Sequence, residues 1–170
     1  MSVVIIDSKV AALLEEVRGI DWSVWSISLP NRLFVYEPDR VLPAFHSLAE
    51  ARTEREASDA YSALLSAIGH NHSGTPYTVM SAATPLLARL VPLLTVSAAA
   101  GMDAVTDCAL WSAGEPPFTG PDGQVHDLGQ DTRRALQSLE PLARRWLEQA
   151  SGARQTEAAA GLLEALAELG

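Results

Sequence analysis

Apolar side chains recur every three or four residues along most of the chain, which is the spacing of one face of an α-helix. In the first such segment, the apolar positions run from Val10 to Val17, after Asp7 and Ser8 and before Gly19. This pattern predicts a helix that Asp7 or Ser8 caps and that Gly19 ends. The same spacing predicts further helices over residues 38–51, 53–68, 77–94, 96–113, 130–150 and 156–169.

Prolines interrupt two of these predicted helices. Pro85 and Pro92 lie within 77–94, and Pro141 lies within 130–150. A proline inside a helix removes a backbone hydrogen bond, so we expect a kink or a break at each position. Pro38, by contrast, suits the first residue of its helix.

Three segments lack the helical pattern. Residues 26–36 are expected to form a loop or a short hairpin, and residues 70–76 a loop with a turn at Ser73-Gly74. Residues 114–129, rich in glycine and proline, are expected to form a long surface loop, a kind of segment that is often functional.

The order of elements defines the predicted fold class. Helices joined by short connections, without a strand pattern, indicate one all-α domain over residues 1–170. We expect antiparallel helix pairs forming a bundle or a short helical solenoid of about seven helices. The last pair, over 130–170, follows the Gly/Pro-rich loop.

Composition restricts the class of protein. Hydrophobic residues make up 48% of 170 residues, which excludes a disordered chain. Cys108 is the sole cysteine, so neither an intramolecular disulfide nor a cysteine-based zinc site can form. Residues 90–102 are a charge-free stretch of the apolar middle and are too short to cross a bilayer, and the brief apolar start has no basic region before it. We therefore expect a cytoplasmic protein.

The net charge of −9 indicates which kind of macromolecule the protein can bind. An acidic chain repels phosphate backbones, which argues against nucleic acid, and attracts a basic protein through complementary fields. Four arginines at 133, 134, 144 and 145 form the one basic concentration, and a solvated helix face accounts for them.

Residues 20–94 carry a family resemblance. Its anchors are Ile20-Asp21-Trp22, Val41-Leu42-Pro43-Ala44-Phe45, His72-Ser73-Gly74-Thr75-Pro76-Tyr77 and Ala82-Ala83-Thr84-Pro85-Leu86-Leu87. With these motifs the segment resembles the HEAT-like helical-repeat proteins of actinobacteria. Ser73 stands where that family has a glutamine, and residues 29–36 replace its His-Ala-Tyr-Gly turn.

The resemblance implies paired antiparallel helices. Some helical-repeat relatives look like immunity proteins that neutralise toxins, and others accompany genes of secondary metabolism. This is a fold-level analogy, and it implies no particular reaction.

His70 and His72 are the first candidate site. Two imidazoles on one loop can bind a metal with a third ligand such as His126 or Asp127, or one can act as a general base. No further ligand spacing supports a metal, so no metal or cofactor is predicted. Alternatively, the His72 ring caps a helix or forms a hydrogen bond across the turn.

Asp103 and Asp107 are the second candidate site, because residues four apart share a helix face. Two carboxylates there can share a proton or hold a divalent ion. Alternatively they form a solvated acidic face or pair with Arg89 or Arg133. If the protein is an enzyme, its catalytic residues are expected to be His70, His72, Asp103 and Asp107.

His126 and Asp127 adjoin in the Gly/Pro-rich loop, but no serine or cysteine can be assigned to them as a nucleophile. Asp127 as a helix cap is the alternative. An apolar ligand pocket is a further hypothesis, with core packing as its alternative; tyrosines 36, 61 and 77 can add donors to it. Its expected lining is Trp22, Trp25, Tyr77, Trp111 and His126, and Trp146 is a further candidate. Cys108 is expected to be buried and inert.

Two functions remain open. The first is a non-enzymatic module that grips a basic protein in a concave acidic face built from Glu and Asp on successive helices. The second is a small enzyme or small-molecule binder of secondary metabolism. Its pocket would lie between the helices at 38–51, 77–94 and 96–113 and would contain His70 or His72, Asp103 or Asp107, and a tryptophan. The Ala/Leu-rich last helix can also serve as a homodimer surface.

Overall fold

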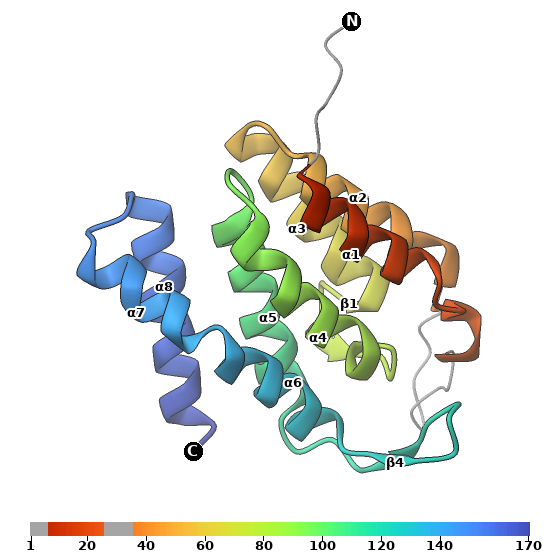
Figure 1. The fold of residues 1–170 in the computed structure, drawn as a ribbon. Helices are drawn as coiled ribbons and strands as arrows, with labels where there is room; N and C mark the ends of the chain where they lie inside the picture. The colour runs from red at the N-terminus through yellow and green to blue at the C-terminus, as the bar shows by residue number, and fades with distance from the viewer. Residues whose placement is uncertain (1–6, 26–35) are drawn as a thin grey trace, which may run out of the picture.

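The computed structural model describes residues 7–25 and 36–170, and it confirms the all-α class. Figure 1 shows the helices packed as a bundle, with a hairpin at one end. The expected loop or hairpin at 26–36 lies outside the described residues, apart from Tyr36. The described α-helices are α1 (Ser8–Arg18), α2 (Val41–Glu50), α3 (Glu54–Ile68), α4 (Met80–Leu90), α5 (Ala98–Ser112), α6 (Leu128–Ser138), α7 (Glu140–Glu148) and α8 (Ala153–Glu168). Short 3-10 turns are η1 (Trp22–Trp25), η2 (Pro38–Arg40) and η3 (Val91–Leu93).

Helix α5 lies at the centre of the bundle, in contact with α3, α4, α6 and α8. Because it is surrounded, its apolar and small residues are not confined to one face, and Ala98–Met102 are all buried. At its start, the Ser97 hydroxyl donates a hydrogen bond to the Leu48 carbonyl at 2.6 Å, which ties α5 to the end of α2.

The helix starts follow local chemistry. The Asp7 carboxylate accepts a hydrogen bond from the Lys9 backbone N–H and caps α1, as expected, and Val10, Leu13, Leu14 and Val17 are its buried face. Thr53 and Glu56 form a capping box at α3, each side chain accepting from the other residue's backbone N–H.

The proline positions determine where two predicted helices end. Helix α4 continues through Pro85 but ends at Leu90, and Pro92 lies in the 3-10 turn η3. The segment predicted as one helix over 130–150 is two helices, because α6 ends at Ser138 and Pro141 lies in the first turn of α7.

Two short hairpins lie where the sequence predicts loops. Strand β1 (Gly69–His70) pairs with β2 (Thr75–Pro76), and β3 (Phe118–Thr119) pairs with β4 (Val125–His126), both antiparallel. Each strand has two residues, too few for an alternating pattern to be visible in the sequence. The second hairpin lies within the predicted Gly/Pro-rich loop.

The C-terminal helices α7 and α8 form an antiparallel pair, visible on the left of Figure 1, and α8 packs on α5 and α6. Helix α8 thereby covers one side of α5. Within the described residues, no helix combines the length and apolar character needed to cross a bilayer.

Candidate functional site

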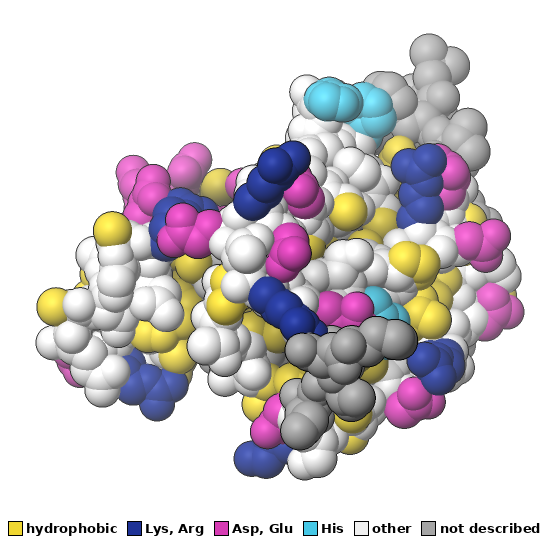
Figure 2. Space-filling model, turned by 90° about the horizontal axis from the view of Figure 1, so that it is seen from above, with side chains coloured by type: hydrophobic (Ala, Val, Ile, Leu, Met, Phe, Trp, Pro, Cys, Tyr) yellow, Lys and Arg dark blue, Asp and Glu magenta, His cyan; other side chains and the backbone are white. Residues whose placement is uncertain are grey.

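Two adjoining pockets lie between α3, α5 and α8. The first has a volume of about 470 Å³ and the second about 400 Å³. Both are lined by Tyr61 of α3, Asp103 of α5 and Arg154 of α8, so the two pockets adjoin at these residues. We call the two pockets together the acidic groove. Figure 2 shows the C-terminal helices, on the left, set off from the remaining helices.

Carboxylates dominate the lining of the acidic groove. Glu54 belongs to the first pocket, and the second adds Asp107 and three glutamates of α8. Arg154 is the one cation among these lining residues. The full set of lining carboxylates is Glu54, Asp103, Asp107, Glu157, Glu164 and Glu168. The groove therefore attracts cations, and its walls come from three helices that are adjacent in space but not consecutive in the chain.

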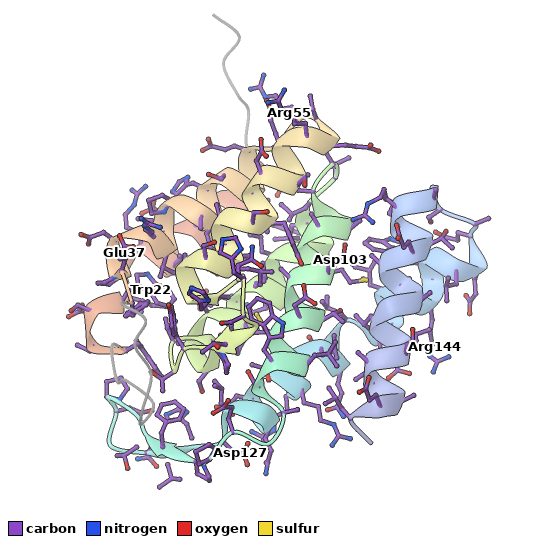
Figure 3. The ribbon with its side chains drawn as sticks, turned by 180° about the vertical axis from the view of Figure 1, so that it is seen from behind. Trp22, Glu37, Arg55, Asp103, Asp127 and Arg144 are labelled. Carbon is purple, nitrogen blue, oxygen red and sulfur yellow. The ribbon has the colours of Figure 1, made fainter. Side chains whose placement is uncertain are left out.

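Asp103 lies between α5 and α8, as Figure 3 shows. Its carboxylate accepts a hydrogen bond from Arg154 Nη2 at 2.8 Å. Arg154 Nη1 donates to Glu157 at 2.6 Å. Burial raises the pKa of Asp103, and the charge and hydrogen bond of Arg154 only partly oppose this shift. The carboxylate is thus partly desolvated, which strengthens its interaction with a nearby cation.

Asp107 lies one turn further along α5 and accepts a hydrogen bond from the Tyr61 hydroxyl of α3. Burial raises the pKa of Asp107, and the hydrogen bond from Tyr61 partly offsets the rise. Burial and the neighbouring carboxylate also raise the pKa of Tyr61, so this side chain stays a neutral donor. The link holds Asp107 in a defined orientation at the floor of the second pocket.

Apolar side chains lie at both ends of the groove. Val96 lines the first pocket and is 41% exposed, and Leu110 lines the second and is 36% exposed. Between them the walls carry the small residues Ala57, Ala99, Ala100, Gly161 and Ala165. Small residues at the walls let another chain approach closely, and exposed apolar ends add surface that it can bury.

The prediction that Asp103 and Asp107 pair with Arg89 or Arg133 is wrong. Arg89 forms a two-pronged ion pair with Glu16 instead, at 2.6 and 2.8 Å. Asp103 pairs with Arg154, which lies 51 residues away in the sequence. Sequence reasoning missed Arg154 because that pairing depends on how α8 docks on α5.

His70 and His72 lie on the β1–β2 hairpin and do not line the acidic groove. Their ring centroids are 6.0 Å apart. His70 Nδ1 is 2.8 Å from the Ser73 hydroxyl, which is in turn 2.8 Å from that of Thr75. The bond across the turn expected of His72 is therefore made by His70. Among residues 7–25 and 36–170, no group of three or more potential ligands is arranged to hold a metal.

The aromatic residues predicted to line one apolar pocket lie in separate parts of the fold. Trp22 is a core residue: its ring stacks near Phe45 at 6.5 Å and its Nε1 donates to the Val17 carbonyl at 3.0 Å. Trp111 borders Gly69 and Gly74 of the first hairpin, Tyr77 packs edge-on against Tyr36 at 5.9 Å, and Trp146 is buried. None of these side chains is part of the lining of the acidic groove, and packing accounts for their positions.

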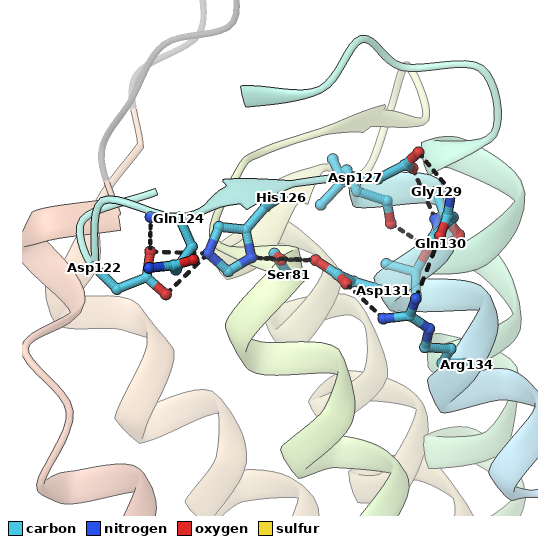
Figure 4. Close-up of polar contacts among 11 residues, drawn as sticks. Ser81, Asp122, Gln124, His126, Asp127, Gly129, Gln130, Asp131 and Arg134 are labelled. Carbon is cyan, nitrogen blue, oxygen red and sulfur yellow. Dashed lines mark hydrogen bonds and ion pairs between the residues drawn. The ribbon is translucent and has the colours of Figure 1, made fainter. Parts of the chain in front are cut away.

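His126 is the centre of a second polar cluster (Figure 4). Its Nε2 is 3.0 Å from Asp122, and its Nδ1 is 3.2 Å from the Ser81 hydroxyl and 3.4 Å from Asp131. Phe118 stacks on the ring at 5.4 Å and Trp25 meets it edge-on at 5.5 Å. No serine could be assigned to this histidine from the sequence, because Ser81 lies 45 residues away.

The order Asp122, His126, Ser81 resembles a hydrolytic triad, but the chemistry differs. The Ser81 hydroxyl donates to Asp131, and Ser81 is 7% exposed, so its oxygen is poorly placed as a nucleophile. Burial lowers the pKa of His126, but its hydrogen bonds to the two carboxylates outweigh this and raise it overall, which disfavours the neutral base. The cluster therefore serves to fasten the β3–β4 hairpin to α4 and α6.

Asp127 is a helix cap, which was the alternative to a functional role, and Cys108 is buried, as predicted. Asp127 caps α6 by accepting a hydrogen bond from the Gln130 backbone N–H at 2.9 Å. Cys108 is fully buried, and burial raises the pKa of its thiol to about 12. A thiol with that pKa is a poor nucleophile at neutral pH.

Comparisons with protein-family models, curated proteins and solved structures give no match for this chain. The HEAT-like resemblance of residues 20–94 therefore stays a prediction, and the function has to be argued from the groove itself.

Proposed function

We propose that this protein is a binding module whose acidic groove grips a basic segment of another protein. The observation that carries the proposal is the lining of the groove: six carboxylates and one arginine, on walls of small residues between three helices. Complementary charge speeds encounter and rejects acidic partners. The net charge of −9 extends the same field over the whole chain.

The exposed apolar residues support a protein partner rather than a free cation. Val96 and Leu110 lie at opposite ends of the groove, where a bound chain can cover both. Protein interfaces combine an apolar contribution with charged groups at their rim. An immunity-like role in the cytoplasm, in which the groove neutralises a basic toxin, is the form of this proposal that the HEAT-like resemblance motivates.

A charge-matched comparison tests the proposal. One variant replaces Glu157, Glu164 and Glu168 in the groove with glutamine. The control replaces Glu15, Glu37 and Glu148, which are exposed and lie outside the groove lining, with glutamine. Both triple variants change the net charge equally, so they separate the groove from the overall field.

The assay is capture from a lysate of the native host followed by quantitative mass spectrometry and affinity measurement on the captured protein. We expect a basic protein that the native chain and the control retain, with at least about tenfold weaker binding by the groove variant. Equal loss with both variants, or capture of an acidic partner, refutes the proposal.

A second candidate is a cationic small molecule in the first pocket, as a binding protein of secondary metabolism would hold. The volume of about 470 Å³ and the apolar residues Ala57, Val96, Ala99 and Ala100 favour it. Analysing the small-molecule fraction of the same capture tests it: a stoichiometric organic cation without a protein partner would replace the first proposal by this one. An enzymatic role for the pocket has no support from His70 or His72, which do not line it.

A further inference from the structure

Arg154 occupies a position in the acidic groove that helix chemistry does not favour. It is the second residue of α8, where the helix dipole is positive and an acidic residue is preferred. Its guanidinium nevertheless bridges two carboxylates, Asp103 of α5 and Glu157 of α8, at 2.8 and 2.6 Å. The side chain remains 52% exposed, so it lies over the groove without being enclosed by it.

The two carboxylates form a ready-made guanidinium site. They meet different nitrogens of the Arg154 fork, which is the geometry that arginine favours and that lysine, as a point charge, does not reproduce. Arg154 lines both pockets, so its side chain lies where the two pockets adjoin. A partner that fills the groove has to displace it or pass around it.

We propose that Asp103 and Glu157 bind an arginine side chain of the basic partner, and that Arg154 occupies this site in the free chain as an internal competitor. This inference rests on the proposed function and adds to it the chemical class of the ligand: an arginine-bearing peptide segment. Arg154 swings into solvent when the incoming guanidinium takes its place. Its displacement reduces affinity for weakly basic chains and thereby selects arginine-rich ones.

The groove also sets the spacing of a second basic side chain. Ala99 of α5 lines the first pocket and Thr106 of the same helix lines the second. These two residues are seven positions apart, which is roughly 10 Å at the rise of an α-helix. A partner can span this distance with residues about three apart in an extended segment, or about seven apart on one helix face.

The test uses labelled peptides and single variants of the full chain. The probe carries arginines three residues apart in an alanine-rich extended sequence, and a matched peptide has citrulline at those positions. The variants are Arg154→Gln, Asp103→Asn and Arg144→Gln. Arg144 is the matched control, because it forms a comparable ion pair with Glu140 at 2.6 Å and lies on the outer side of the C-terminal helices (Figure 3).

We expect the native chain to bind the arginine peptide and to leave the citrulline peptide unbound. Arg154→Gln should bind the arginine peptide about three- to tenfold more tightly, as the competing ion pair is lost. Asp103→Asn should bind it more weakly, and Arg144→Gln should match the native chain. Melting temperatures of all variants show whether Arg154 also braces α8 against α5.

The outcomes separate the inference from the function on which it rests. If the native chain binds the arginine peptide and Arg154→Gln binds it equally or more weakly, Arg154 is a brace and the inference is overturned while the proposed function stands. Equal tightening by Arg144→Gln would show an effect of overall charge and would also overturn the inference. If neither the native chain nor any variant binds the peptide, both proposals fail.

Discussion

Two glycines inside helices differ in their surroundings, and this difference predicts opposite effects of the same substitution. Gly101 lies in the central helix α5, where an added Cβ would be 2.8 Å from Val91 Cγ2 and 3.5 Å from Leu48 Cδ2. Gly161 lies in α8, where an added Cβ would meet nothing within 4 Å. The substitutions Gly101→Ala and Gly161→Ala therefore share a chemical change and differ in packing.

The magnitudes follow from two opposing terms. Replacing glycine by alanine inside a helix stabilises the folded state by up to about 1 kcal/mol. A methyl group forced into a filled core costs about 1–3 kcal/mol, and Val91, being β-branched and fully buried, has little freedom to move aside. We expect Gly161→Ala to be more stable than the native chain by about 1 kcal/mol, and Gly101→Ala to be less stable by up to about 2 kcal/mol.

Urea unfolding measures both changes, provided that the slope with denaturant is unchanged. Because the helix-propensity gain is common to both variants, the difference between them isolates the steric cost at α5. Val91→Ala in the Gly101→Ala background should recover part of the loss, with a coupling of about 0.5–3 kcal/mol. Equal stabilisation by the two alanines would refute the close packing of α5 against η3.

Three further predictions concern buried hydrogen bonds and charge. Ser97→Ala leaves the Leu48 carbonyl without its 2.6 Å donor and should cost about 1–3 kcal/mol in urea unfolding; a loss under about 0.5 kcal/mol would contradict the buried bond. The raised pKa of His126 means that its contribution to stability is complete below the ordinary histidine pKa and is lost as pH rises through the raised value. The stability difference between native chain and His126→Asn should shrink over that window, and a pH-independent difference would refute the ion pairs. The raised pKa values of Asp103 and Asp107 mean that affinity for a basic peptide is full above those values and falls as pH drops through them. Titrations against pH should show this loss at a higher pH than for ordinary aspartates, and affinity unchanged down to the ordinary aspartate range would refute it.

The helices were predictable because their signals are local. Spacing, a cap at Asp7 and a stop at Gly19 determine α1 without reference to the rest of the chain. The capping box of Thr53 and Glu56 likewise lies within four residues. The sequence predicts an interruption of the helix at Pro141, but it does not show whether the helix kinks or breaks there. That outcome depends on how α6 and α7 pack on α8 and its neighbours.

Only part of the candidate site could be predicted, because its residues come from helices that are far apart in the sequence. Asp103 and Asp107 stand out in the sequence because they are four apart on one helix. Their actual partners, Tyr61 and Arg154, lie 46 and 51 residues away and are brought close only by tertiary packing. Ser81 and His126 are 45 residues apart in the sequence, so their polar cluster forms only when the chain folds.

The acidic groove is not the sole acidic surface in the described part of the chain. Glu50, Glu56 and Asp59 line another depression between α2 and α3. Glu56, however, is already engaged by the backbone N–H groups of Arg52 and Thr53 in the capping box, and these hydrogen bonds lower its pKa. A partner that binds by charge alone would use both surfaces, whereas a partner fitted to the groove uses one.

Nuclear magnetic resonance of the isotope-labelled chain, titrated with the arginine peptide, tests the central claim most directly. The groove predicts the largest shifts at backbone amides of residues 57–61, 99–107 and 154–161, which flank Tyr61, Asp103 and Arg154. Saturation at one equivalent, with those shifts absent in the triple groove variant, is the expected result. Shifts centred on Glu50, Glu56 and Asp59, or spread evenly over the acidic surface, would contradict the account.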